Sequence, residues 1–142
     1  MKKRVLILCT GNSCRSQMAE ALINARLGDC WQAFSAGTQP AARVNPRAIQ
    51  ALAEIGIVTE DSKPKHIQEF IGQAFDVVIT VCDDANENCP LWPGQGKRVH
   101  IGFPDPANAT GTEAEIMNVF REVRDAITEQ IPGYLEAFTG DA

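Results

Sequence analysis

Long hydrophobic runs are missing from this 142-residue sequence, and so is an excess of positive charge. A helix that crosses a membrane needs about 20 consecutive apolar residues, and the first apolar run, residues 5–8, is far shorter. The formal net charge of −5 argues against a general affinity for nucleic acid or for anionic membranes. We therefore expect no nucleic acid and no membrane as a partner, and any site for an anion must be local.

A cleavable leader is not expected either, although the start MKKRVLILC superficially resembles one. The apolar run after the basic residues is too short for a signal peptide, and TGNSCRS offers no small-residue cleavage site. We interpret residues 4–8 as the buried first strand of a cytoplasmic protein. In such a protein, the odd number of five cysteines predicts reduced or redox-active thiols rather than a framework of structural disulfides.

Metal-binding and nucleotide-binding patterns are scarce as well. The sequence has no C-x-x-C pair and two histidines, and the six residues between Cys82 and Cys89 are not a zinc-ligand spacing. We therefore expect no metal site. The nucleotide P-loop pattern G-x-x-x-x-G-K-[ST] is also absent.

Short apolar runs alternate with segments of helical periodicity along the chain. Strands are predicted at residues 4–8, 32–38, 76–81 and 98–103. Helices are predicted after Arg15 as far as Gly28, from Pro46 to Gly56, at 66–73, and from Glu113 onward with a kink or a restart at Pro132. In the second of these helices, the apolar face is expected to carry Ile49, Leu52, Ala53 and Ile55.

This alternation is typical of an α/β fold. We predict a four-stranded parallel sheet of strand order 2-1-3-4, with helices on both faces, in a single domain that spans residues 1–142. Ligands of such folds bind beyond the carboxyl ends of the strands. Cys9, Cys82 and Asp105 follow three of the predicted strands. With this strand order, Cys9 and Cys82 should emerge side by side.

The loop from Cys9 to Arg15 has the spacing C-x5-R. Five residues can wrap so that backbone N–H groups point inward, and together with the N-terminus of the following helix they form a site for an anion. The planar guanidinium of Arg15 matches a tetrahedral oxyanion bidentately. The same surroundings favour a thiolate, which makes Cys9 a candidate nucleophile. The predicted oxyanion-binding residues are Thr10, Gly11, Asn12, Ser13, Cys14, Arg15 and Ser16.

Individual residues of this loop carry further expectations. Gly11 and Asn12 are types that tolerate a positive φ, which so tight a loop demands. Ser16 can donate a hydrogen bond to the Cys9 sulfur. We expect Cys14 to point into the protein and to have no catalytic role. The alternative interpretation of the whole segment is a strand-to-helix turn that buries two cysteines.

Three stretches together resemble the thioredoxin-coupled arsenate reductases, which are built on the low-molecular-weight protein tyrosine phosphatase fold: CTGNSCRSQMAEAL, VITVCDDANENCP and GFPDPA. The resemblance implies that Cys9 attacks arsenate and that Asp105 protonates the departing oxygen. It further implies that Cys82 attacks Cys9 and releases arsenite, that Cys89 then attacks Cys82, and that thioredoxin reduces the final disulfide. Alternatively, Asp105 caps a turn, and Cys82 and Cys89 are inert loop thiols.

The resemblance also bears on a cation. Asn12, Glu20 and Ser35 resemble positions that surround a potassium site in some members, but those members carry an acid near position 65, where this chain has Lys65. This difference argues against a bound monovalent cation, so no cofactor is expected apart from thioredoxin as external reductant.

Two other functions remain open at this point, a phosphatase and a non-enzymatic thiol sensor. Hydrolysis of a phosphoester needs a nucleophile, an arginine and an acid, whereas two further cysteines are what a two-electron reduction needs. The family's phosphatases usually carry an aromatic residue after the Asp-Pro step, where this chain has Ala107. Both observations favour the reductase.

Overall fold

The computed structural model describes residues 2–59, 61–83 and 92–138 of the chain. Its strands are β1 (Lys3–Cys9), β2 (Trp31–Gly37), β3 (Val77–Thr80) and β4 (Lys97–His100). They form one four-stranded sheet in the order β2-β1-β3-β4, and each neighbouring pair is parallel. The predicted α/β fold and its strand order are therefore confirmed.

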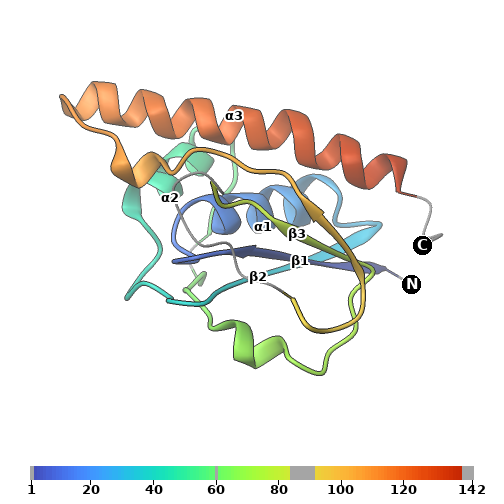
Figure 1. Cartoon of the computed structure of the whole chain (residues 1–142). Helices are drawn as coiled ribbons and strands as arrows, with labels where there is room; N and C mark the ends of the chain where they lie inside the picture. Colours follow the sequence, from blue (N-terminus) through green and yellow to red (C-terminus); the bar gives the residue numbers. More distant parts are fainter. Residues whose placement is uncertain (1, 60, 84–91, 139–142) are drawn as a thin grey trace.

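The helices cover the two faces of the sheet unequally. The α-helices are α1 (Arg15–Arg26), α2 (Pro46–Ala53) and α3 (Glu113–Ala137), and the 3₁₀ helices are η1 (Ile67–Phe70) and η2 (Pro106–Asn108). Figure 1 shows the three α-helices on one side of the sheet and η1 on the other. In the described part of the chain, the second face thus carries a single 3₁₀ turn rather than the longer helix predicted at residues 66–73. Gly72, with φ of 92°, lies just beyond this turn.

Alternate residues of β1 face the two sides of the sheet, as the pleat of a strand requires. Val5 and Ile7 belong to a core cluster with side chains of all three α-helices. Leu6 and Leu8 belong to a second cluster, in which Phe70, Phe75 and Trp92 cover the other face. All four β1 side chains are fully buried, which explains why the strand appears in the sequence as a continuous apolar run.

Two helix predictions need correction. In α2, Ile49 is 36% exposed, and the residues that are buried are Ala48, Ala51 and Leu52. Small alanine side chains let a short helix approach its neighbours closely, so burial here follows geometry rather than hydrophobicity. Pro132 lies inside the uninterrupted helix α3.

The continuity of α3 through Pro132 has a packing explanation. Proline removes one backbone hydrogen bond and crowds the preceding turn, and this favours a break. However, Ile131 and Leu135 flank Pro132 and are both buried in the core cluster on the helical face of the sheet. Their packing holds the last turns of α3 in line.

The carboxyl ends of β1 and β3 and the N-terminus of α1 meet at one edge of the sheet, where the candidate site lies. In the register of the two strands, Leu8 pairs with Thr80, and Leu8 O accepts a hydrogen bond from Val81 N at 2.9 Å. None of the helices in the described ranges is both long and apolar enough to cross a membrane.

Candidate active site

The loop between β1 and α1 is fixed by its carbonyl groups. Thr10 O accepts a hydrogen bond from Gln39 N at 2.9 Å, and Gly11 O accepts one from Ala41 N at 2.9 Å. Ser13 O accepts a third from the backbone N–H of Asn45, at 3.0 Å. The segment that follows β2 therefore pins successive loop carbonyls on the outer side of the loop.

This outward pinning turns the amide groups inward, because the C=O and N–H of a trans peptide point in opposite directions. The N–H of Asn12 shows the direction, since it donates to Cys9 Sγ at 3.3 Å. Behind the loop, α1 begins at Arg15, and its N-cap residue Cys14 makes no side-chain capping bond. Loop amides and the first N–H groups of α1 are thus the donors that the predicted anion site would need, and the binding of an anion there stays a prediction.

Asn12 adopts the left-handed backbone conformation that the loop requires. It has φ of 49°, whereas Gly11 is not among the residues with positive φ, so of the two predicted positions only Asn12 takes this conformation. Its side chain is anchored on both sides. Asn12 Oδ1 accepts from Lys65 N at 2.8 Å and from Gln17 Nε2 at 3.1 Å. Asn12 Nδ2 donates to Ser16 Oγ at 2.7 Å.

These contacts orient the hydroxyl of Ser16 toward the candidate nucleophile. Ser16 Oγ lies 2.8 Å from Cys9 Sγ. Ser16 Oγ accepts a hydrogen bond from Asn12 Nδ2, and when Cys9 is a thiolate, which can only accept, the Ser16 hydroxyl is the donor of this pair. Cys9 is 2% exposed and receives this hydroxyl and the Asn12 N–H. Hydrogen bonds of this kind stabilise a thiolate and a thiol leaving group, as predicted for Ser16.

Arg15 and Asp105 face each other across the mouth of the loop. Arg15 is 3% exposed, and its Nη1 donates to Phe103 O at 3.2 Å. Its Nη2 lies 3.6 Å from Asp105 Oδ2. The other oxygen of Asp105 accepts from Ala107 N at 3.0 Å and so caps η2. Asp105 thus caps a turn with one oxygen and presents the other to the arginine, and the two predicted roles are compatible.

A small cavity of about 60 Å³ lies between these groups. Its lining residues are Cys9, Gly11, Asn12, Ser13, Cys14, Arg15, Asp105 and Ala107. Pockets for drug-sized organic ligands are typically about 300–1,000 Å³, so this one suits a small anion. None of the lining residues is aromatic. Thr10 and Ser16, which we predicted to bind the oxyanion, support the loop from outside this lining.

Cys14 is among the residues that line the cavity, but it is only 5% exposed and belongs to the core cluster on the helical face of the sheet, in line with the expectation that it points into the protein. Burial is the main reason why the pKa of its thiol is raised to about 12, and the negative charges of Asp105 and Cys9 act in the same direction. These effects outweigh the hydrogen bond from Ser13, which lowers the pKa. Cys14 therefore remains a protonated thiol at neutral pH and does not compete with Cys9 as a nucleophile.

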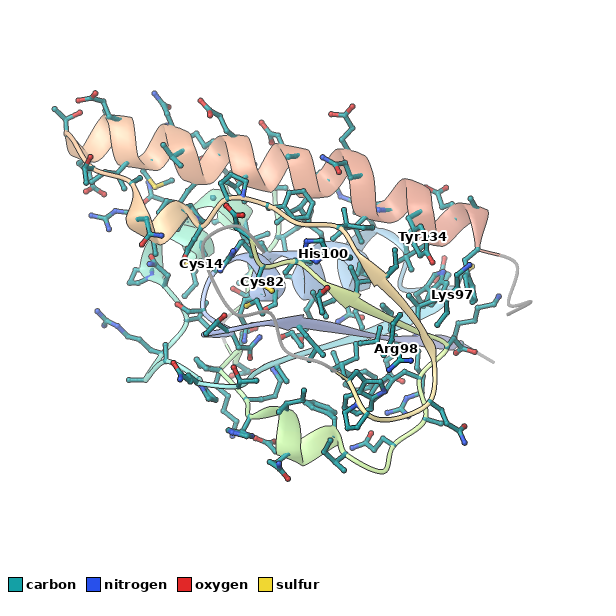
Figure 2. The ribbon with its side chains drawn as sticks, in the orientation of Figure 1. Cys14, Cys82, Lys97, Arg98, His100 and Tyr134 are labelled. Atoms are coloured by element: carbon teal, nitrogen blue, oxygen red, sulfur yellow. The ribbon has the colours of Figure 1, made fainter. Side chains whose placement is uncertain are left out.

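Cys82 follows β3 and is completely buried in the same core cluster as Cys9. Figure 2 shows Cys82 and Cys14 at the same end of the sheet, whereas Lys97 and Tyr134 lie at the opposite end. Cys82 is disulfide-bonded, while Cys9, Cys14 and Cys30 are free thiols. The predicted proximity of the Cys9 and Cys82 strand ends is thus present. Cys89 lies outside the described residues.

Sequence reasoning missed the supports of the loop. The backbone donors of Gln39, Ala41 and Asn45 carry no signal in their side chains, so nothing in the sequence marks them. Gly37, by contrast, is a support that its residue type could have indicated. A Cβ at Gly37 would lie 2.4 Å from Thr10 O, so only glycine allows β2 to end so close to the loop. In residues 2–59, 61–83 and 92–138, no group of three or more His, Cys, Asp or Glu is placed to hold a metal ion.

A family model described as low molecular weight phosphotyrosine protein phosphatase matches residues 4–141. The chain belongs to this family. Within the low molecular weight phosphatase family, an arsenate reductase from Halalkalibacterium halodurans is 47% identical to this chain over 135 residues, which is 95% of this chain and 96% of that protein.

Solved structures with a similar fold include both arsenate reductases and a phosphatase. An arsenate reductase from Archaeoglobus fulgidus has a TM-score of 0.71 and 31% identity, and the match covers 90% of this chain and 98% of that one. A thioredoxin-dependent arsenate reductase from Corynebacterium glutamicum has a TM-score of 0.68 and 27% identity, and the match covers 96% of this chain and 64% of that one. A low molecular weight protein tyrosine phosphatase from T. tengcongensis has a TM-score of 0.76 and 25% identity, and the match covers 96% of this chain and 100% of that one. The fold alone therefore does not choose between reduction and hydrolysis.

Proposed function

We propose that this protein is an arsenate reductase in which Cys9 is the nucleophile and Cys82 receives the oxidising equivalent. One observation carries the proposal. A buried, disulfide-bonded cysteine follows β3, the strand next to the one that ends in Cys9. Hydrolysis of a phosphoester has no use for a redox-active cysteine there, whereas reduction of arsenate requires one.

In the first step, the inward amides and Arg15 hold arsenate with its arsenic atom in front of Cys9 Sγ. The thiolate forms a sulfur–arsenic bond, and one oxygen departs as water after Asp105 donates a proton to it. Asp105 Oδ2 is 3.6 Å from Arg15 Nη2, so an oxyanion bound to this guanidinium lies beside the carboxyl group. Arsenic is still As(V) at this stage.

Reduction occurs in the second step. The Cys82 thiolate attacks Cys9 Sγ, a sulfur–sulfur bond forms, and the electron pair of the broken sulfur–arsenic bond stays on arsenic. Arsenic leaves as arsenite, As(III), and two thiols have become one disulfide, so the electrons balance. Cys89 then attacks Cys82 and frees Cys9. The dithiol of thioredoxin reduces the resulting disulfide and returns the protein to its starting state.

The thiol states support this order of events. Cys9 is free while Cys82 is disulfide-bonded, which corresponds to the point in the cycle after Cys9 has been released. Cys14 is held protonated by burial, which raises its pKa. Cys30 is an exposed residue with a free thiol. Its backbone carbonyl accepts a hydrogen bond from Lys3 N, so Cys30 lies at the amino end of the sheet, away from Cys9. In this proposal Cys89 is therefore the resolving thiol.

Thioredoxin as the reductant, and the cytoplasm as the location, belong to the same proposal. The Corynebacterium glutamicum neighbour is thioredoxin-dependent, and a cycle that ends in a disulfide needs a dithiol donor. The cytoplasm supplies such donors and keeps other thiols reduced.

A phosphatase is the second candidate, because Cys9, Arg15 and Asp105 are sufficient for phosphoester hydrolysis. Two observations disfavour it. The cavity lining contains Ala107 but no aromatic side chain, so a phenyl ring would find no stacking partner among these residues. The second observation is the disulfide-bonded Cys82, for which hydrolysis has no use.

The experiment that separates these functions measures NADPH oxidation by thioredoxin reductase, thioredoxin and this protein on addition of arsenate. We expect steady turnover by the wild type and by the control Cys30→Ser, and none by Cys82→Ser. Release of phosphate from an aryl phosphate is measured in parallel. Aryl phosphate hydrolysis that is unaffected by Cys82→Ser, without NADPH oxidation, would establish the phosphatase instead. Steady turnover would also exclude a sensor that lacks enzymatic activity.

A further inference from the structure

A partly buried ion pair lies behind the active loop, on the side away from the cavity. Lys65 Nζ lies 3.5 Å from Glu20 Oε1, and the two side chains are only 19% and 17% exposed. The same carboxylate oxygen accepts a hydrogen bond from Ser35 Oγ at 2.7 Å. Lys65 Nζ also donates to Lys63 O at 3.2 Å. A positive charge is thus surrounded by oxygen atoms from α1 and from the segment before η1.

This ion pair is connected to Cys9 through a short series of hydrogen bonds. Lys65 N donates to Asn12 Oδ1 at 2.8 Å, and Asn12 Nδ2 donates to Ser16 Oγ at 2.7 Å. Ser16 Oγ is 2.8 Å from Cys9 Sγ. The backbone N–H of Lys65 thus orients Asn12, and the side-chain ammonium of Lys65 pairs with Glu20 on α1. Lys65 therefore links the active loop to α1.

Gln17 reinforces this connection. Its Nε2 donates to Lys63 O at 2.9 Å and to Asn12 O at 3.2 Å. On the other side, Gly37 N donates to Lys65 O at 2.9 Å. The segment that carries Lys65 is thereby held against the loop, the first turn of α1 and the end of β2.

The residues around Glu20 do not fit a bound potassium ion. The carboxylate of Glu20 already has a cationic partner, and a second cation beside Lys65 Nζ would meet like-charge repulsion. An acid at position 65 would add a ligand for a metal cation, whereas a lysine supplies the positive charge itself. We propose that the ammonium of Lys65 is a built-in cation that positions the active loop and makes the reactivity of Cys9 independent of potassium.

Ions from solution can reach the site of the Lys65 ammonium once the lysine is replaced. Glu20 and Lys65 both line an open groove of about 580 Å³ between α1 and the segment that precedes η1. In Lys65→Met the stem is retained, but Glu20 loses its counterion. Potassium can then enter the groove and neutralise Glu20. The proposal concerns the reactivity of Cys9 and is independent of the oxyanion that Cys9 attacks.

The test measures the rate at which iodoacetamide alkylates Cys9 at pH 7, by peptide mapping, in potassium chloride and in tetramethylammonium chloride of equal ionic strength. The wild type should react equally fast in both salts. Lys65→Met should react about fivefold more slowly in tetramethylammonium chloride, which corresponds to about 1 kcal/mol for one ion pair, and potassium should restore the rate.

Three further variants make the test specific. Lys65→Arg keeps the charge and should behave like the wild type in both salts. Glu20→Gln with Lys65→Met removes both charges, and the rate should no longer respond to potassium. Arg121 on α3 forms a more exposed ion pair with Glu54, and Arg121→Met, which removes that pair, should leave the alkylation rate unchanged. Circular dichroism checks that each variant is folded.

Two results would overturn the proposal. One is a wild type whose Cys9 reacts faster in potassium than in tetramethylammonium chloride, since a built-in cation leaves no role for potassium. The other is a folded Lys65→Met variant that reacts at the wild-type rate in both salts. Either result can be obtained whether or not the protein reduces arsenate, so this inference and the proposed function fail separately.

Discussion

The two ends of the active loop each carry a cysteine, and the two cysteines have opposite surroundings. Cys9 and Cys14 line the same cavity and are 2% and 5% exposed. Cys9 faces the Asn12 N–H and the hydroxyl of Ser16. Cys14 has the hydroxyl of Ser13 at 3.9 Å and feels the negative charge of Asp105. The proposed role of Cys9 as the nucleophile therefore rests on the hydrogen-bond donors aimed at its sulfur, whereas burial raises the pKa of Cys14.

Replacing the two cysteines is the strongest way to challenge this comparison. Cys9→Ser should lower arsenate-dependent NADPH oxidation by more than about 10³-fold, because the reacting sulfur is removed. Cys14→Ala should change the rate by less than about threefold, since the loop amides that hold the oxyanion are retained. A Cys14→Ala variant as inactive as Cys9→Ser would show that the assignment of the nucleophile is wrong.

Asp105 lies beside Arg15 and is the general acid in our proposal. Asp105→Asn should slow turnover by about 10²–10⁴-fold, the usual effect of losing a general acid. Binding of sulfate, measured by calorimetry, should change little, because Arg15 and the amides remain. Wild-type turnover by Asp105→Asn would mean that Asp105 only caps η2.

The hydroxyl groups beside the two sulfurs provide a matched pair. Ser16→Ala removes a donor 2.8 Å from Cys9 Sγ, and a hydrogen bond to a charged group contributes about 1.5–3 kcal/mol. The alkylation of Cys9 at pH 7 should therefore become at least about tenfold slower. Ser13→Ala removes the more distant partner of Cys14 and should not affect this rate. Equal effects of the two substitutions would remove the distinction between the two cysteines.

The smallest effect concerns stability at high pH. Burial, with the charges of Asp105 and Cys9, raises the pKa of Cys14 from 9.0 to about 12. The folded state therefore binds this proton more tightly than the unfolded state, so the contribution is complete below pH 9 and is lost as the pH rises toward 12. Between pH 8 and pH 10.5, the free energy of unfolding of the wild type should fall by about 2 kcal/mol more than that of Cys14→Ala. Urea titrations at the two pH values measure this difference, and parallel curves would contradict it.

The sequence was informative wherever a feature depends on neighbouring residues. The spacing of Cys9 and Arg15, followed by a helical pattern, predicts an anion loop because one short segment contains all the parts. The apolar runs of β1 and β3 predict strands buried on both faces, and the predicted strand order 2-1-3-4 places Cys9 beside Cys82. The sheet topology confirms the strand order, whereas the anion loop stays a prediction.

Features that depend on distant backbone groups were not predictable. The donors at Gln39, Ala41 and Asn45 are main-chain atoms of a loop without a motif. The burial of Ala48 instead of Ile49 depends on how closely α2 packs, which periodicity does not encode. The sequence shows that a lysine stands at position 65 where some related proteins carry an acid, but only the structure shows that Lys65 pairs with Glu20.

The most direct test of the relay follows the disulfides after a single turnover. Reduced Cys89→Ser protein is mixed with one equivalent of arsenate, quenched by alkylation, and analysed by peptide mapping and arsenite quantification. We expect one arsenite for each protein molecule and a disulfide that joins Cys9 to Cys82, with Cys14 and Cys30 still reduced. Arsenite release without that disulfide, or repeated turnover of Cys89→Ser with thioredoxin, would contradict the account.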